Sequence, residues 1–164
     1  MNQLTQQTKQ IAELLPKISK NLQIVPLLNE VKPGLTTSQL IILLILRDMK
    51  NAALPVGKLA QELAISFPAV SGIIDRLYRD KLIERSHSTQ DRRIVLVKLS
   101  DTGKDIIEKL LHSFETIIFD ILKKIPEMDR QSIINATQRV LTFSSALTKN
   151  DLDGTIPSSN TSTP

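Results

Sequence analysis

The chain has 164 residues, a length that suits one domain with terminal extensions. It contains no cysteine, which excludes disulfides, thiolate metal sites and cysteine-based redox sensing. Lys and Arg outnumber Asp and Glu by 21 to 17, and this basic balance is compatible with DNA or a membrane surface as a partner. The first residues are polar, and the longest apolar run, residues 40–46, is too short to cross a bilayer. We therefore expect a soluble cytoplasmic protein with no membrane partner.

The first apolar pattern, over residues 4–31, has the spacing of a helix. It contains Pro16 and Pro26, and we expect these prolines to kink or split the helix because proline lacks the N–H of a helical hydrogen bond. Lys-Pro-Gly at residues 32–34 predicts its end. Thr36 and Gln39 then form a capping-box pattern before an apolar run, which predicts a second helix buried in the core.

Two shorter helices are predicted next, separated by a brief connection. The first lies within residues 54–63 and has one apolar face. The second, over residues 67–81, follows Ser66, a favourable N-cap, and accepts Pro68 because proline is tolerated in the first helical turn. A short helix, a tight turn and a second helix predict a helix-turn-helix, whose second member we call the recognition helix.

From residue 82 the apolar period changes from that of a helix to that of a strand. LIERSH and IVLVKLS predict two strands, and the polar residues 88–93 between them predict the turn of a β-hairpin. Ser100 is then expected to cap a long helix that ends at Pro126, and Asp129 to cap a last helix. The small, polar and proline-containing residues 150–164 predict a disordered tail.

Together these elements predict a mainly α fold with a small β-hairpin wing, an α+β winged helix-turn-helix flanked by N- and C-terminal dimerisation helices. The terminal helices carry more apolar positions than one winged domain can cover, which favours a homodimer. The predicted regions are an N-terminal dimerisation region at 1–33, the winged domain at 34–100, C-terminal dimerisation helices at 101–149 and the tail at 150–164.

The predicted DNA-binding surface begins on the recognition helix, because the second helix of a helix-turn-helix enters the major groove. Opposite its apolar stripe the helix carries small residues near its start and arginines toward its end. Small residues let the backbone approach the bases, and arginine binds phosphate or guanine. The predicted contact residues on this helix and its cap are Ser66, Pro68, Ala69, Ser71, Gly72, Arg76 and Arg79.

The hairpin tip adds Asp91, Arg92 and Arg93 to this surface. A hairpin beside the recognition helix reaches the adjacent minor groove, where narrow A·T-rich segments attract arginine. We expect Arg92 or Arg93 to enter that groove and the other to contact phosphate or to pair with Asp91. The expected role of Asp91 is to orient an arginine through a bidentate ion pair.

Five short motifs follow one another along the winged region. They are Val-Ser at 70–71, Asp-Arg-Leu at 75–77, Leu-Ile at 82–83, Asp-Arg-Arg at 91–93 and Leu-Ser-Asp-Thr-Gly at 99–103. In type and spacing they resemble the MarR family of prokaryotic transcriptional regulators. The resemblance implies a homodimer, pseudo-palindromic DNA sites and release by a small ligand, here expected to be an apolar or aromatic acid in an apolar pocket beside the terminal helices. The family usually has glycine where this chain has Lys81, which leaves the hairpin angle open.

We therefore predict a sequence-specific DNA-binding transcriptional regulator, a repressor released by a ligand. No catalytic residue, cofactor or metal site is predicted, because the sequence lacks a Gly-rich phosphate loop and a His-Glu-x-x-His motif. The alternative is a winged-helix protein-interaction adaptor without DNA binding, which would have no basic wing. Residues 76–93 hold six Lys or Arg against three Asp or Glu, which favours DNA over the adaptor.

Overall fold

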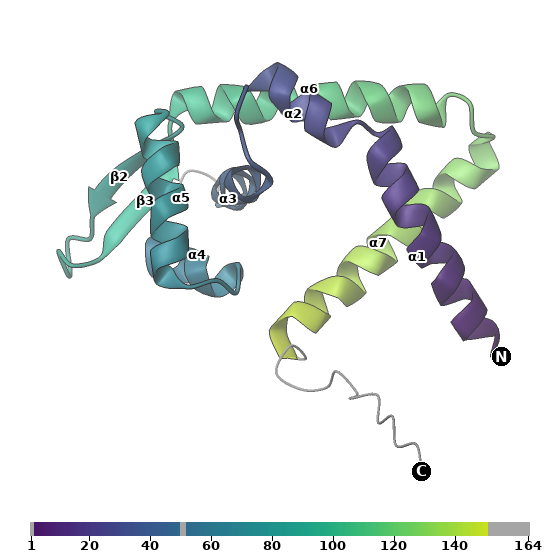
Figure 1. Ribbon diagram of the computed structural model, residues 1–164, viewed down its shortest axis with the longest axis horizontal. Helices are drawn as coiled ribbons and strands as arrows, with labels where there is room; N and C mark the ends of the chain where they lie inside the picture. Colours follow the sequence, from purple (N-terminus) through teal and green to yellow (C-terminus); the bar gives the residue numbers. More distant parts are fainter. Residues whose placement is uncertain (1, 50–51, 151–164) are drawn as a thin grey trace, which may run out of the picture. The chain divides into compact units, whose positions relative to one another are not determined.

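The computed structural model describes residues 2–49 and 52–150, which form helices and one small sheet (Figure 1). The helices are α1 (Gln3–Asn21), α2 (Ile24–Val31), α3 (Thr37–Asp48), α4 (Val56–Glu62), α5 (Phe67–Arg79), α6 (Asp101–Leu122) and α7 (Glu127–Asn150). The strands are β1 (Leu54–Pro55), β2 (Ile83–His87) and β3 (Val95–Leu99). The predicted mainly α fold with a winged helix-turn-helix is confirmed. Of the predicted tail, residues 150–164, Asn150 is the last residue of α7 and the others lie outside the described residues.

The N-terminal helical pattern is split, but the break does not lie at a proline. It lies at Gln23, whose φ of 49° is left-handed and separates α1 from α2. Pro16 stays inside α1, and Pro26 lies in the first turn of α2, where no helical N–H is lost. The predicted end at Lys-Pro-Gly is confirmed, because α2 stops at Val31 and Gly34 adopts a φ of 79°, a conformation that suits glycine.

The predicted capping box at the start of α3 is present. The Gln39 N–H donates to the Thr36 hydroxyl at 3.3 Å, and the Thr36 N–H donates to Oε1 of Gln39 at 2.8 Å. These bonds satisfy two N–H groups that the first helical turn would otherwise leave unpaired. The helix then delivers Leu43 and Leu46 into the core, so the prediction of a buried helix is also confirmed.

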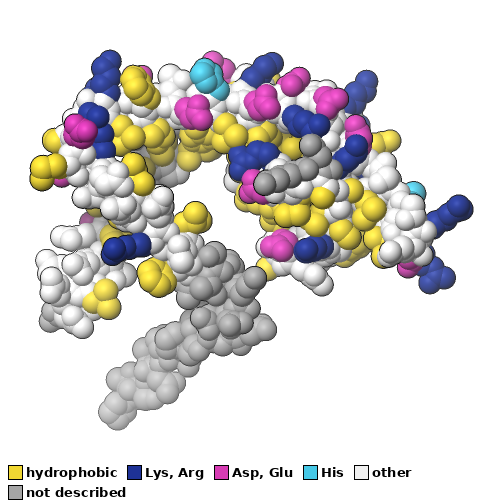
Figure 2. Space-filling view, turned by 180° about the vertical axis from the view of Figure 1, so that it is seen from behind, with side chains coloured by type: hydrophobic (Ala, Val, Ile, Leu, Met, Phe, Trp, Pro, Cys, Tyr) yellow, Lys and Arg dark blue, Asp and Glu magenta, His cyan; other side chains and the backbone are white. Residues whose placement is uncertain are grey.

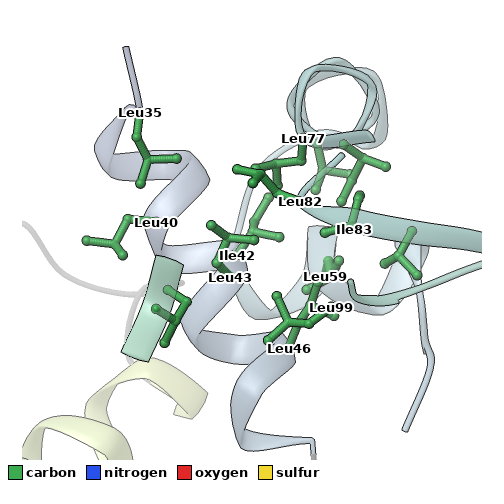
Figure 3. Packing of buried hydrophobic residues seen from close by; sticks show 14 of the residues in the cluster. Leu35, Leu40, Ile42, Leu43, Leu46, Leu59, Leu77, Leu82, Ile83 and Leu99 are labelled. Atoms are coloured by element: carbon green, nitrogen blue, oxygen red, sulfur yellow. The ribbon is translucent and has the colours of Figure 1, made fainter. Parts of the chain in front are cut away.

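The core of the first part of the chain is aliphatic and joins α3, α4, α5, the sheet and α6 (Figure 3). Its most deeply buried side chains are Ile42, Leu43, Leu46, Leu59, Val70, Ile74, Leu77, Leu82, Val97, Ile107 and Leu110. Three of them, Val70, Ile74 and Leu77, belong to the predicted apolar stripe of α5, and the fourth member, Ile73, is partly buried against the same core. Because this stripe packs on the core, the recognition helix is fixed in orientation and its opposite face is left for another partner.

The sheet has three strands, whereas the sequence predicted two. Its order is β1-β3-β2, with β2 and β3 antiparallel from Ile83 opposite Leu99 to His87 opposite Val95. The additional strand, β1, pairs Leu54 with Val97. A two-residue strand has no alternating pattern by which it could be recognised. Strand β3 therefore pairs with β2 along one edge and with β1 along the other. The β1 pairing connects the wing to the segment that leads into α4.

The recognition helix ends at Arg79, two residues before the predicted end, and Lys81, the position where glycine was expected, follows the C-cap Asp80. Lys81 adopts a left-handed φ of 59° and donates its N–H to the Tyr78 carbonyl at 2.9 Å. The Leu82 N–H donates to the Leu77 carbonyl, also at 2.9 Å. These two bonds make a Schellman motif, in which a Cβ is strained but not excluded. Lysine therefore preserves the helix end that glycine would give.

Replacing Lys81 with Gly is expected to stabilise the protein by about 1 kcal/mol, because it removes the left-handed strain. The expected rise in Tm is about 2–4 °C, measured by thermal unfolding. Lys81→Ala is the matched control, since it removes the charged side chain but keeps the Cβ, and it should give no gain. An equal rise in both variants would show that the side chain, and not the backbone conformation, is the source of strain.

The start of α6 is bound to the end of α5 through Ser100, the predicted cap. Its hydroxyl accepts the Gly103 N–H at 3.0 Å and donates to the Lys81 carbonyl at 2.6 Å, while its own N–H donates to the Leu82 carbonyl at 3.1 Å. Gly103 is buried against that same Leu82 carbonyl. These contacts of Ser100 and Gly103 join the start of α6 to residues 81–82, which follow α5.

The two long helices begin and end close to the predicted points. Asp101 in the first turn of α6 accepts a hydrogen bond from Lys104, and this bond and the lysine charge lower the pKa of the Asp101 carboxyl. The helix ends at Leu122, ahead of Pro126. The prediction that Asp129 caps the last helix is wrong: α7 begins at Glu127, because Pro126 already provides the first carbonyl, and Asp129 lies within the first turn.

The described chain divides into two compact units, of which the first ends at Ile117 and the second begins at Ile118. The first unit holds the winged helix-turn-helix together with α1, α2 and most of α6. The second holds the end of α6 and α7. The candidate DNA-binding residues therefore all belong to one unit.

Candidate nucleic-acid interface

The turn between α4 and α5 positions the start of the recognition helix. Ala64 takes a left-handed φ of 51°, and the Ile65 N–H donates to the Ala60 carbonyl at 3.1 Å, which closes α4. Ser66 then caps α5, its hydroxyl accepting the Ala69 N–H at 3.4 Å. The predicted N-cap is confirmed, and it places the first turn of α5 at the surface.

The predicted contact residues of the recognition helix lie on its outer face. Five of them are exposed, namely Ser66, Pro68, Ala69, Arg76 and Arg79. Ser71 and Gly72 are partly buried. A Cβ built on Gly72 would meet no atom within 4 Å, so the protein's own packing does not require glycine there. The space above Gly72 is open to an approaching molecule.

The tip of the wing, residues 88–94, is a tight turn in which the backbone and the side chain of Asp91 both accept hydrogen bonds. The Ile94 N–H donates to the Asp91 carbonyl at 3.0 Å, and the Arg93 N–H donates to Oδ1 of Asp91 at 2.9 Å. Arg92 and Arg93 occupy the two central positions of this turn. The carboxylate of Asp91 thus binds a backbone N–H and not an arginine guanidinium, so the expected bidentate pair is not formed among the described residues.

Two further side chains hold the wing tip in shape. The Ser88 hydroxyl accepts the Gln90 N–H at 3.2 Å, and Nδ1 of His87 donates to the Arg92 carbonyl at 2.8 Å. This bond requires that the His87 proton lies on Nδ1, because a carbonyl only accepts. Figure 2 shows Lys and Arg side chains projecting from the edge of the molecule that the hairpin forms. Arg92 and Arg93, the two arginines of the turn, are both exposed.

One residue that sequence reasoning missed, Arg85 on β2, joins the wing to the recognition helix. Its guanidinium makes an ion pair with Oδ1 of Asp75 and lies 4.8 Å from the centre of the Tyr78 ring. Asp75 and Tyr78 are on α5, ten and seven positions before Arg85 in the sequence. No local pattern links residues on two different elements, so only the folded structure could reveal this contact.

On the candidate DNA-binding surface, acidic side chains are paired with basic ones, whereas the predicted contact arginines are not paired with acidic ones. Three acidic side chains of the winged region are paired: Asp75 with Arg85, Asp80 with Lys32, and Glu84 with Lys98. The Glu84–Lys98 hydrogen bond, together with the glutamate charge, raises the pKa of Lys98. Within residues 2–49 and 52–150, the ion pairs include none of the predicted contact arginines, Arg76, Arg79, Arg92 and Arg93. Those four positive charges are therefore available to an anionic partner.

The same residues hold neither a metal-binding cluster nor a helix suited to crossing a membrane. Among them, no group of three or more His, Asp and Glu side chains is arranged to hold a metal ion. No described helix combines the length and the hydropathy needed to span a membrane. A shallow depression at the wing tip is lined by His87, Ser88, Thr89 and Arg92, and is thus part of the basic surface already described. The predicted apolar effector pocket stays a prediction.

Comparison with known proteins identifies the type of molecule. Residues 35–95 match the model of the MarR family. The HTH-type transcriptional repressor MdtR of Bacillus subtilis is 30% identical over 109 residues, which cover 66% of this chain and 69% of the relative. The chain belongs to the MarR family. The HTH-type transcriptional repressor YetL, also from Bacillus subtilis, is 26% identical over 101 residues, which cover 62% of this chain and 60% of YetL.

Solved structures of the MarR fold agree with the architecture. The YusO protein from Bacillus subtilis superposes with a TM-score of 0.66 at 26% identity, covering 86% of this chain and 99% of YusO. FabT from Streptococcus pneumoniae, solved in complex with DNA, gives a TM-score of 0.68 at 19% identity and covers 85% of this chain and 99% of FabT. At this identity the likeness to FabT concerns the fold alone.

Membership of the MarR family decides between the broad classes considered above. The relatives are named as transcriptional regulators or repressors, and regulation of transcription is not an enzymatic activity. The chain is accordingly a winged-helix transcriptional regulator and not an enzyme. The predictions of a transcriptional regulator and of a protein that is not an enzyme are both confirmed. The alternative, a winged-helix adaptor without DNA binding, is not supported.

Proposed function

We propose that this MarR-family protein represses transcription by binding a pseudo-palindromic operator as a homodimer. The observation that carries the proposal is a set of arginines on one unit that have no ion-pair partner among the described residues: Arg76 and Arg79 on α5, and Arg92 and Arg93 in the wing turn. Four arginines at fixed positions suit a duplex whose phosphates recur at regular spacing. A protein surface offers no such regular array of negative charge.

In the proposed complex the recognition helix lies in the major groove and the wing reaches the next minor groove. The first turn of α5 is exposed and carries small residues, Pro68 and Ala69, which admit the edges of the bases. Arg76 and Arg79 lie toward the end of the helix, where phosphate contacts fix its position. Arg92 or Arg93 enters the minor groove, where a narrow A·T-rich segment has the most negative potential.

Binding should fall steeply with salt, because each phosphate contact releases counterions from DNA. The measurement is a titration of the protein against DNA that flanks its own gene, at two or more salt concentrations, with a shuffled sequence as control. We expect tight, salt-dependent binding to the flanking DNA and weaker binding to the shuffled sequence. Equal affinity for both would contradict sequence-specific recognition, and no affinity for either would return the adaptor to consideration.

Exposed apolar side chains on the terminal helices support a homodimer. Helix α1 has no buried residue, yet it exposes Leu4, Ile11, Leu14, Leu15 and Ile18, each by more than half of its surface. Helix α7, considered by itself, exposes Met128, Val140, Leu141 and Phe143. Soluble monomers rarely expose apolar stripes of this length, so a second copy of the chain is the proposed cover.

Sedimentation at micromolar concentration is expected to give about twice the chain mass of 18.3 kDa. Replacing Leu14 with Glu should shift the protein to monomer, because it puts a charge within the exposed apolar stripe of α1 on both copies. Gln6→Glu adds the same charge outside that stripe and should leave the dimer intact. A monomeric wild type, or a dimeric Leu14→Glu variant, would contradict this role of α1.

The proposal extends to an effector and a location. A small apolar or aromatic acid is the expected effector, because MarR-family membership carries that expectation; no charged residue of the chain points to a particular compound. Such a compound should reduce operator affinity without dissociating the dimer, which the same titration would detect. The proposed location is the cytoplasm, where the operator DNA lies.

A further inference from the structure

Arg85 lies between the two parts of the proposed DNA-binding surface, the recognition helix and the wing. From β2 its guanidinium reaches back to α5, where it pairs with Asp75 and stacks on Tyr78. Its side chain is 28% exposed, and that of Asp75 is 58% exposed. The Asp75 carboxylate is therefore exposed enough to interact electrostatically with an approaching molecule.

The position of Asp75 makes its charge a problem for DNA binding. Along α5, Asp75 lies one turn before Arg79 and close to one turn after Gly72, so it shares the outer face with predicted contact residues. A carboxylate on that face repels the phosphates that Arg76 and Arg79 are proposed to bind. Its only ion-pair partner among the described residues is Arg85.

Stability alone does not account for this arrangement. The Nε of Arg85 is buried and has no acceptor within the part of the chain that the structure describes. A buried donor without an acceptor lowers stability, and an exposed ion pair contributes little to it. The pair is therefore better explained by what it does to the charge of the outer face than by what it adds to folding.

We propose that Arg85 is a positioning residue that neutralises Asp75 and so permits the recognition helix to approach DNA. The inference rests on the proposed function, since it concerns the affinity of the same surface for an operator. In this view the important property of Arg85 is its positive charge beside Asp75. A purely structural clamp between α5 and the wing is the competing explanation.

The test is a set of variants at positions 75 and 85, assayed for operator affinity with thermal unfolding as the control for folding. Arg85→Ala should weaken operator binding by about tenfold or more, because it leaves a bare carboxylate facing phosphate in each copy of the dimer. Arg85→Lys should bind much more tightly than Arg85→Ala, since it keeps the charge. The decisive variant combines Arg85→Ala with Asp75→Asn, which removes both charges and should restore binding to within a fewfold of wild type.

Each outcome has a distinct meaning. Restoration by the double variant supports charge neutralisation, because a structural clamp would stay broken when both partners are lost. A double variant as weak as Arg85→Ala would overturn the inference, as would wild-type affinity in Arg85→Ala itself. If a variant is unfolded at the assay temperature, the affinities are measured at a lower temperature at which the wild type and all three variants are folded. Failure of the proposed function looks different: the wild-type protein itself would then not bind the operator.

Discussion

Replacing Arg92 and Arg93 together with Ala is expected to weaken operator binding by tenfold or more while leaving the fold and the dimer intact. Each arginine contact with phosphate or a narrow minor groove contributes on the order of 1–3 kcal/mol, and a symmetric dimer uses two wings. The fold should survive because the bonds that shape the tip use the backbone of both arginines and the side chains of Ser88, Asp91 and His87. The measurement is operator affinity, with unfolding temperature as the check on stability.

Two controls separate the wing contact from general charge and from turn shape. Lys123→Ala with Lys124→Ala removes the same charge from the exposed turn between α6 and α7 and should change affinity little. Asp91→Ala removes the carboxylate that binds the Arg93 N–H and should cost less than the loss of both arginines. Unchanged affinity in the double-arginine variant would mean that the wing does not contact DNA.

Replacing Gly103 with Ala is expected to destabilise the protein by about 2–3 kcal/mol, the cost of overpacking a tightly filled site. A Cβ there would overlap the Leu82 carbonyl oxygen and lie 3.3 Å from Cδ2 of Leu99. The carbonyl has little freedom to move, because it already accepts the Ser100 N–H. Urea or thermal unfolding measures the loss, which is a large part of a typical stability of about 5–15 kcal/mol.

Gly57→Ala is the matched control for this variant, because a Cβ on Gly57 would meet nothing within 4 Å. Alanine also has the higher helix propensity, so the control should be neutral or stabilise the protein by up to about 1 kcal/mol. If Gly103→Ala were as harmless as Gly57→Ala, the tight contact between α6 and residue 82 would be wrong.

The features that the sequence predicted well are those decided by neighbouring residues. Thr36, Ser66 and Ser100 cap helices as expected, because a cap bonds an N–H only two or three positions away. The apolar stripe of α5 is buried as expected, because helical period alone decides which side chains share a face. The positions of the wing arginines follow from the hairpin pattern in the same way.

The features that the sequence did not predict depend on contacts between distant segments. Strand β1 is defined by pairing with β3, more than forty positions later, and two residues carry no period. Arg85 is an ordinary polar strand position until the fold brings Asp75 and Tyr78 beside it. The carboxylate of Asp91 was expected to bind an arginine guanidinium, but it accepts the Arg93 N–H. The backbone N–H is held close by the turn, whereas ordering a long arginine side chain costs conformational entropy.

The construction of the wing tip also bears on how such regulators diverge. The turn is held by backbone groups and by Ser88, Asp91 and His87, while the side chains at its two central positions extend outward. Substitutions at positions 92 and 93 would therefore leave folding nearly untouched and alter only what the tip touches. After gene duplication, changes in the codons for residues 92 and 93 would be enough to give one copy a new operator preference. Because these changes cost little folding stability, no second mutation is needed to restore it.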